Sequence, residues 1–99
     1  MAVRSIGGTI TSTGATESVE LNGSGNVLLD FSGAVATISL EKSFDDGSTW
    51  HVASKDSVPN PATYTDDING VVEEHEYHVL YRFNCTSYSS GTINYRISR

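Results

Sequence analysis

The longest regular pattern in this chain is Tyr77-His78-Val79-Leu80-Tyr81-Arg82-Phe83-Asn84-Cys85-Thr86, in which aromatic, aliphatic or thiol side chains take every odd position. Successive side chains of a β-strand point to opposite faces of its sheet, so a period of two predicts a strand with one buried face. The odd positions, among them Val79, Phe83 and Cys85, are therefore predicted to face the core.

The segments around this strand carry the same kind of pattern. Thr92 to Ser98 places Ile93, Tyr95 and Ile97 on one face, and we expect it to pair back on the preceding strand across a turn at Ser87 to Ser90. Helical periodicity is nearly absent, while β-branched and aromatic runs recur between clusters of Gly, Ser, Asn and Asp. The sequence predicts an all-β fold, a single antiparallel β-sandwich of Ig-like type with about seven or eight strands.

Two further hairpins are predicted in the part of the chain that precedes this strand. Val27 to Phe31 and Val35 to Phe44 alternate on either side of Ser32-Gly33, which predicts a turn between paired strands. Asn69-Gly70 is a pair typical of a type I′ turn and predicts another hairpin. The predicted core collects the inward positions of all these strands: Leu29, Phe31, Ile38, Leu40, Trp50, Val79, Tyr81, Phe83, Ile93, Tyr95 and Ile97.

The chain of 99 residues has the length of one domain. Residues 16–99 are assigned to the β-sandwich. Residues 1–15 are assigned to an N-terminal arm or an edge strand, because their small side chains form weak strands. Asp56 to Pro61 contains two prolines, so we expect it to be a loop outside the central ladder.

The eight residues 43–50 fit the pattern S-x-D-x-G-x-T-W, which specifies the geometry of a turn. Ser43 and Asp45 can accept hydrogen bonds from turn amides, and Gly47 can adopt the positive φ that a tight turn needs. Thr49 completes the motif, and Trp50 is predicted to fold its indole under the hairpin onto the core.

This motif resembles the Asp-box of sialidase-type proteins. In that family the box lies on the outside of propeller blades, away from the catalytic centre, and occurs in several copies. The present chain has one copy, and a propeller needs at least four blades of roughly 40 to 50 residues each. The resemblance therefore implies a turn and no sialidase activity.

The charge balance excludes one class of partner. Twelve acidic and six scattered basic residues give a formal net charge of −6. Phosphate binding requires clustered Lys and Arg, so nucleic acid is not expected as a partner. We interpret the acidity as favouring solubility. The alternative interpretation is that the acidic protein docks on a complementary basic surface of a partner.

The residues that could bind a metal ion are not arranged as a metal site in the predicted strands. On a regular strand Glu74, Glu76 and His78 would share one face at steps of about 7 Å, with His75 on the other face, so a solvated strand is favoured over a metal site. Asp66 to Gly70 lacks the D-x-[DN]-x-[DN]-G spacing of a calcium loop and is better explained as a turn. Neither a metal nor another cofactor is expected.

The parts of a catalytic site do not assemble in the sequence. Cys85 is the single cysteine, so it forms no internal disulfide, and its inward position makes it a small apolar group. No serine lies in a G-x-S-x-G elbow. We expect a protein that is not an enzyme, made in a cytoplasm because the N-terminus lacks a signal peptide, and without a membrane span.

Three residues are candidates for an interface. Arg82 and Arg96 are predicted to face outward on neighbouring strands, where they would become anchors if the sheet packs against a partner. Tyr88 lies in the last predicted turn. Together with Tyr64 and with His51 beside Trp50, it offers the alternative of a shallow glycan-binding face.

Three segments in sequence carry a second resemblance. They are N-G-x-G-N-V-L-L-D-F-S-G from Asn22, A-T-I-S-L-E-K-S-F-D-D-G-S-T-W from Ala36, and Y-R-F-N-C-T-S-Y-S-S-G-T-I-N-Y-R-I-S from Tyr81. Their order, over roughly residues 21 to 98, resembles small β-sandwich virion proteins of tailed bacteriophages.

This resemblance implies a structural role in a virion made in the bacterial host cytoplasm. A capsid decoration protein that binds the major capsid protein is the favoured expectation, as a homo-oligomer with a trimer as the first expectation. The alternatives are a tail or neck component of the virion, or a glycan-binding module on the particle surface.

Overall fold

The computed structural model describes residues 5–53 and 62–98, without the side chains of His75 and Tyr77. The described chain contains eight β-strands and no helix. The strands are β1 (Ser5–Ile10), β2 (Gly14–Ala15), β3 (Val19–Asp30), β4 (Val35–Ser43), β5 (His51–Val52), β6 (Thr63–Tyr64), β7 (Ile68–Ser90) and β8 (Ile93–Ser98). The expected loop at residues 56–61 lies outside the described residues.

All eight strands belong to one antiparallel sheet. Its order is β1-β8-β3-β7-β4-β5, with β2 paired to β7 and β6 paired to β4. The predicted all-β antiparallel fold is confirmed. The strands form one open sheet, and a sandwich of two separate sheets is not shown.

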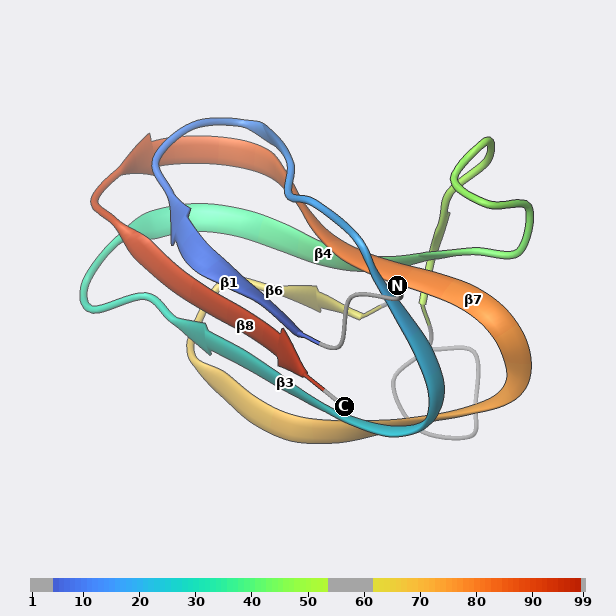
Figure 1. Cartoon of the computed structure of the whole chain (residues 1–99). Helices are drawn as coiled ribbons and strands as arrows, with labels where there is room; N and C mark the ends of the chain where they lie inside the picture. The colour runs from blue at the N-terminus through green and yellow to red at the C-terminus, as the bar shows by residue number, and fades with distance from the viewer. Residues whose placement is uncertain (1–4, 54–61, 99) are drawn as a thin grey trace.

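The sheet curls because β7 is long and bent (Figure 1). Its first part pairs with β3, and its second part, from Leu80 to Ser90, pairs with β4. The register against β3 passes from Leu21↔Val79 to Gly23↔Glu74, so four residues of β7 oppose one residue of β3. An irregularity of this kind bends a strand and increases its twist.

The bend also changes which face of β7 is buried. Glu74, an even position, is buried before the bend, whereas the odd positions from Val79 to Cys85 are buried after it. His78 takes a φ of 63°, and Gly23, near the same point of β3, takes a φ of 104°. The alternation predicted for 77–86 is confirmed from Val79 to Cys85.

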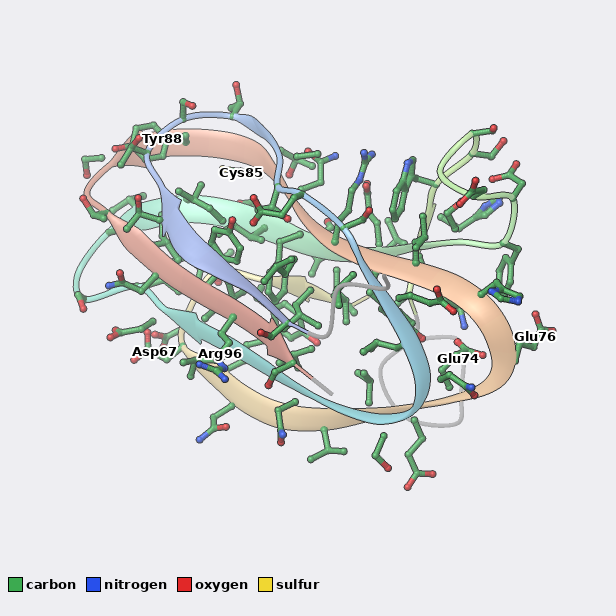
Figure 2. The ribbon with its side chains drawn as sticks, in the orientation of Figure 1. Asp67, Glu74, Glu76, Cys85, Tyr88 and Arg96 are labelled. Carbon is green, nitrogen blue, oxygen red and sulfur yellow. The ribbon has the colours of Figure 1, made fainter. Side chains whose placement is uncertain are left out.

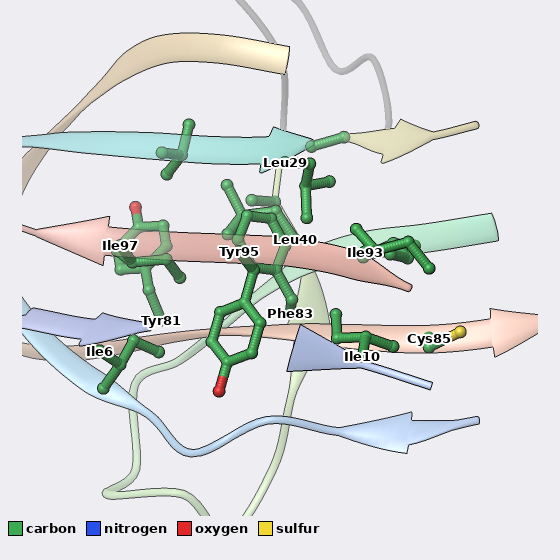
Figure 3. Close-up of a cluster of buried hydrophobic side chains, with 14 of the residues drawn as sticks. Ile6, Ile10, Leu29, Leu40, Tyr81, Phe83, Cys85, Ile93, Tyr95 and Ile97 are labelled. Carbon is green, nitrogen blue, oxygen red and sulfur yellow. The ribbon is translucent and has the colours of Figure 1, made fainter. Parts of the chain in front are cut away.

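The core lies inside the curl of the sheet (Figure 3). Phe83 of β7 and Tyr95 of β8 meet edge to face with ring centroids 6.2 Å apart. Burial of each large apolar side chain stabilises the fold by about 1.5–3 kcal/mol. Every predicted core residue except Trp50 is buried, and the core also includes Ile6, Ile10, Val19, Leu21 and Val27.

Three predicted strand pairings are wrong. β3 and β4 are separated by β7, although Ser32 (φ 48°) and Gly33 (φ 84°) do turn the chain between them. β8 pairs with β1 and β3 and makes no pair with β7. Asn69 and Gly70 are not a turn, because they lie inside β7 opposite Leu28 and Val27 of β3.

These differences have one physical cause. β7 is long enough to provide both of its edges to strands from distant parts of the chain, which leaves no edge for its sequence neighbours. The sharp connection from β7 to β8 at Gly91 (φ 93°) carries the chain to the other arm of the curled sheet.

Candidate binding surface at the Ser43–Trp50 turn

The turn between β4 and β5 is held by hydrogen bonds from two side chains. Ser43 Oγ accepts bonds from the N–H groups of Asp45 (3.3 Å) and Gly47 (2.9 Å), and it donates to Asp45 Oδ1 (2.8 Å). Asp45 Oδ1 also accepts a bond from the Thr49 N–H at 2.8 Å. Gly47 has a φ of 91°, a conformation that favours glycine.

These bonds favour the charged form of Asp45. The hydrogen bond from Ser43, followed by the one from the Thr49 amide, lowers the pKa of the Asp45 carboxyl below its ordinary value. Ser43 itself is fully buried at the end of β4. The motif therefore organises a turn, as its residue types predict.

Trp50 lies on the outer face of the sheet and does not reach the core, which corrects the prediction. Its indole Nε1 donates to the Gly47 carbonyl at 3.1 Å, and its ring stacks with the guanidinium of Arg82, whose Cζ is 4.0 Å from the ring centroid. Trp50 is half-buried. It directly precedes β5, whose exposed residues His51 and Val52 pair with Lys42 and Glu41 of β4.

The stacked Arg82 also binds a carboxylate on the neighbouring strand. Arg82 Nε donates to Glu41 Oε1 at 2.9 Å, and Asn84 Nδ2 donates to Glu41 Oε2 at 3.1 Å. The side chains of Arg82 and Glu41 are only 23% and 12% exposed, so this pair is better shielded than a surface ion pair. These contacts connect Glu41, Trp50, Arg82 and Asn84 on the outer face of the sheet. We call this set the outer-face cluster.

The β4–β5 hairpin also presents apolar surface. Val52, next to Glu41 in the register, is 47% exposed. Phe44 is 52% exposed, with Lys42 Nζ 5.1 Å from its ring centroid and the His51 ring 6.4 Å away. The exposed aromatic ring of Phe44 is the feature that this hairpin shares with protein-binding surfaces, in which aromatic residues are enriched.

A buried polar cluster lies behind the hairpin, at the bend of β7. Glu74 accepts hydrogen bonds from the Tyr81 hydroxyl (2.7 Å) and the Glu76 N–H (3.1 Å), and its Oε1 lies 3.3 Å from Lys42 Nζ. Burial alone would raise the pKa of Glu74, but the bonds from Tyr81 and Glu76 and the charge of Lys42 outweigh it and lower that pKa. Burial, and then Glu74, raise the pKa of Tyr81.

The structure separates the acidic residues that the sequence places on one face. Glu74 is 6% exposed, while Glu76 is exposed at the bend (Figure 2). His78 is exposed as well. The irregular register between β3 and β7 breaks the predicted row. Among the described residues, no group of three or more His, Cys, Asp or Glu side chains could hold a metal ion.

Asp66 and Asp67, which precede β7, accept hydrogen bonds from backbone N–H groups. Asp66 Oδ1 accepts a bond from the Asp67 N–H at 2.8 Å, and Asp67 Oδ1 accepts one from the Phe31 N–H at 2.7 Å. The second bond ties the start of β7 to the end of β3.

The remaining interface candidates do not gather in one place. Arg96 is exposed on β8, a strand that does not pair with the strand of Arg82, so the two are not neighbours as predicted. Tyr88 lies at the far end of β7 from the bend (Figure 2), where its hydroxyl donates to the Gly91 carbonyl. Tyr64 and Tyr88 are partly buried and pack against the core. The shallow glycan-binding face expected from Tyr64, Tyr88 and His51 stays a prediction.

Sequence reasoning missed Glu41 and Glu74 as structural residues. Both are carboxylates in strands, where local pattern alone indicates solvent exposure. Their partners, Arg82 and Lys42, are more than 30 residues away in the chain, so no local signal could identify them.

Cys85 is buried and its thiol donates to the Ser87 carbonyl at 3.3 Å. Burial raises the pKa of this thiol, which keeps it in the neutral form. The inward position predicted for Cys85 is confirmed.

Comparisons with protein-family models, curated proteins and solved structures give no match. A search of the described residues for a helix long and apolar enough to cross a membrane finds none.

Proposed function

We propose that this chain is a structural protein of a bacteriophage virion, and that it acts as a decoration protein on the assembled capsid. The proposal combines the sequence resemblance over residues 21–98 with the structural role of the most specific motif, residues 43–50. That motif holds a turn and, through Trp50, contributes to the outer-face cluster. A motif that fixes backbone geometry in this way supports the proposal of a binding or assembly module.

The observation that carries the proposal is the hairpin of β4 and β5. Its turn is organised by Ser43 and Asp45, and its outer face is covered by Trp50 on Arg82. A rigid hairpin loses little conformational entropy when a partner binds, so it suits repeated binding to a regular shell. Val52 and Phe44 supply exposed apolar groups beside it.

The mechanism follows from mass action. A protein that binds the assembled shell and not its separated subunits stabilises the shell, by an amount that grows with free concentration relative to Kd. Each bound copy would add contacts that resist rupture. No chemical step is required.

The test is the copy number of this protein in purified virions, measured by quantitative mass spectrometry against the major capsid protein. A simple ratio set by the capsid lattice is expected for decoration. A few copies to a few dozen per particle would instead place the protein in the tail or neck. Absence from the particle would overturn both structural roles.

A second measurement tests the surface. Phe44→Ala and Val52→Ser should each weaken binding to shells that lack the protein, whereas Asn26→Ser, at an exposed position of β3, should not. Circular dichroism would check that each variant is folded. Equal binding by all three variants would show that the hairpin is not the docking surface.

A further inference from the structure

Two asparagines of the chain are followed by glycine, in the pairs Asn22-Gly23 and Asn69-Gly70. Asparagine is a chemically labile residue, and it loses its side-chain amide fastest before glycine, because glycine has no Cβ to hinder attack by its own backbone nitrogen. The other four asparagines precede proline or a residue with a larger side chain. From the sequence alone, Asn22 and Asn69 are equal candidates for this reaction.

The structure places Asn22 where the ladder between β3 and β7 is interrupted. Asn22 is exposed, and it lies between Leu21 and Gly23, the two positions at which the register against β7 shifts. Gly23 has a φ of 104°, and a Cβ built there would meet nothing within 4 Å. The pair therefore combines an exposed side chain, irregular pairing and open space around the glycine.

Asn69 is also exposed, but it lies in a regular part of the same ladder. Asn69 and Gly70 form consecutive pairs with Leu28 and Val27 of β3. The hydrogen bond that Asp67 accepts from β3 at 2.7 Å holds this end of β7 in place. Ring closure between an asparagine side chain and the next nitrogen requires rotation of the main chain, and at Asn69 that rotation requires local opening of the ladder.

A third pair, Asp46-Gly47, can form the same cyclic imide from aspartate. It lies in the turn between β4 and β5, where the Gly47 N–H donates to Ser43 Oγ at 2.9 Å. The attacking nitrogen is therefore already engaged in the folded protein. Of the three pairs, Asn22-Gly23 is the one whose surroundings in the structure restrain the reaction least.

We propose that Asn22 is a site of spontaneous deamidation and isomerisation in the folded protein, and that the fold protects Asn69. The Gly23 nitrogen gives its proton to solvent and attacks Asn22 Cγ, so that an N–Cγ bond forms and the Cγ–Nδ2 bond breaks. Ammonia leaves after taking a proton from water. Water then opens the cyclic imide: breaking the new N–Cγ bond gives aspartate, and breaking the original peptide bond gives isoaspartate.

The product changes both the charge and the main chain at the bend of the sheet. Each event adds one negative charge to a chain whose net charge is already −6. The new carboxylate lies one residue from Gly23, the register partner of the buried Glu74. Isoaspartate also adds a methylene to the main chain of β3, the strand with fewer residues at the irregularity. The inference does not rest on the virion role.

The test incubates the purified full chain in mildly alkaline buffer and then maps its peptides by mass spectrometry. Trypsin releases Asn22 within residues 5–42 and Asn69 within residues 56–82, so one sample reports both sites. Deamidation appears as the mass change from NH2 to OH, and fragmentation locates it. We expect Asn69 to react at least about tenfold more slowly than Asn22, because it reacts only in molecules whose ladder is locally open.

The same incubation in guanidinium chloride is the matched control. Unfolding removes the ladder, so the rates at Asn22 and Asn69 should then agree within about twofold. The inference is overturned by equal rates in the folded protein, by faster reaction at Asn69, or by a difference that persists in denaturant. It is also overturned if Asn22 stays intact in the folded protein for a time in which the unfolded chain reacts.

Two variants give an independent reading. Glutamine closes the corresponding six-membered ring far more slowly, so Asn22→Gln should abolish the mass change in residues 5–42 and leave that in residues 56–82 unaltered. Asn69→Gln should leave the rate at Asn22 unaltered. A mass change that persists in Asn22→Gln would place the reaction at Asn26 and overturn the inference. In the unmodified chain, aspartate without isoaspartate at position 22 would overturn the imide route.

Discussion

Among the described glycines, Gly91 is the one at which the fold leaves least room for a side chain. A Cβ built there would lie 2.5 Å from the Ala34 Cβ, and the backbone φ is 93°. We expect Gly91→Ala to lower the free energy of unfolding by about 3 kcal/mol, since positive φ and overpacking each cost on the order of 1–3 kcal/mol. Chemical denaturation would measure the loss.

Gly33→Ala is the control for this change. Gly33 has a similar φ of 84°, but a Cβ there would meet nothing within 4 Å. We expect a loss of only about 1 kcal/mol from backbone strain. Equal losses at the two positions would contradict the assignment of the larger cost to crowding against Ala34.

Arg82 and Arg96 differ in what surrounds them, although the sequence treats them alike. Arg82→Ala removes the stack on Trp50 and leaves the mostly buried Glu41 with one fewer donor. We expect a loss of about 2 kcal/mol in unfolding free energy. Arg96→Ala, at an exposed position, should stay within about 0.5 kcal/mol. Urea melts of both variants would test the contrast.

At the scale of elements, the buried and hydrogen-bonded carboxylate of Glu74 lies at the bend of β7. Because the pKa of Glu74 is lowered in the folded state, its stabilising effect is present above its ordinary value of 4.5 and is lost as the pH falls through the lower folded value. Unfolding free energy measured from pH 7 down to pH 2 should therefore drop below about pH 4.5.

Glu74→Gln should weaken this part of the pH dependence. It removes the charge that faces Lys42 and keeps the size of the side chain, so we expect a loss of about 1–3 kcal/mol at pH 7 and a flatter profile in acid. Glu76→Gln, at an exposed position of the same bend, is the control. If the steep loss of unfolding free energy in acid persists in Glu74→Gln, that loss is due to other carboxylates.

At the scale of the whole molecule, nearly all pairing joins distant parts of the chain. β3 and β8 pair across the intervening strands, and β7 connects β3 to β4. Proteins dominated by such non-local pairing fold in about milliseconds to seconds, because the entropic cost of closing long loops comes before the contacts that offset it.

Stopped-flow refolding should therefore show a rate in that range. Trp50 is the single tryptophan and reports the hairpin, whereas far-ultraviolet circular dichroism reports the whole sheet. We expect both signals to change together, as in a two-state domain. Microsecond folding, or a hairpin signal that precedes the sheet signal, would contradict this view.

The sequence by itself determined the class of fold and most of the core. Strand alternation is local, so the inward positions of Val79 to Cys85 and of β8 were readable, and so was the turn chemistry of Ser43, Asp45 and Gly47. These features depend on residues within a few positions of one another.

Only the tertiary structure decided which strands pair and where Trp50 lies. The predicted hairpins failed because one long strand, β7, gives its edges to β3 and β4, and the energies that select this arrangement come from partners far apart in sequence. Trp50 faces Arg82 and not the core for the same reason. Pairing order is a global property, and local pattern does not encode it.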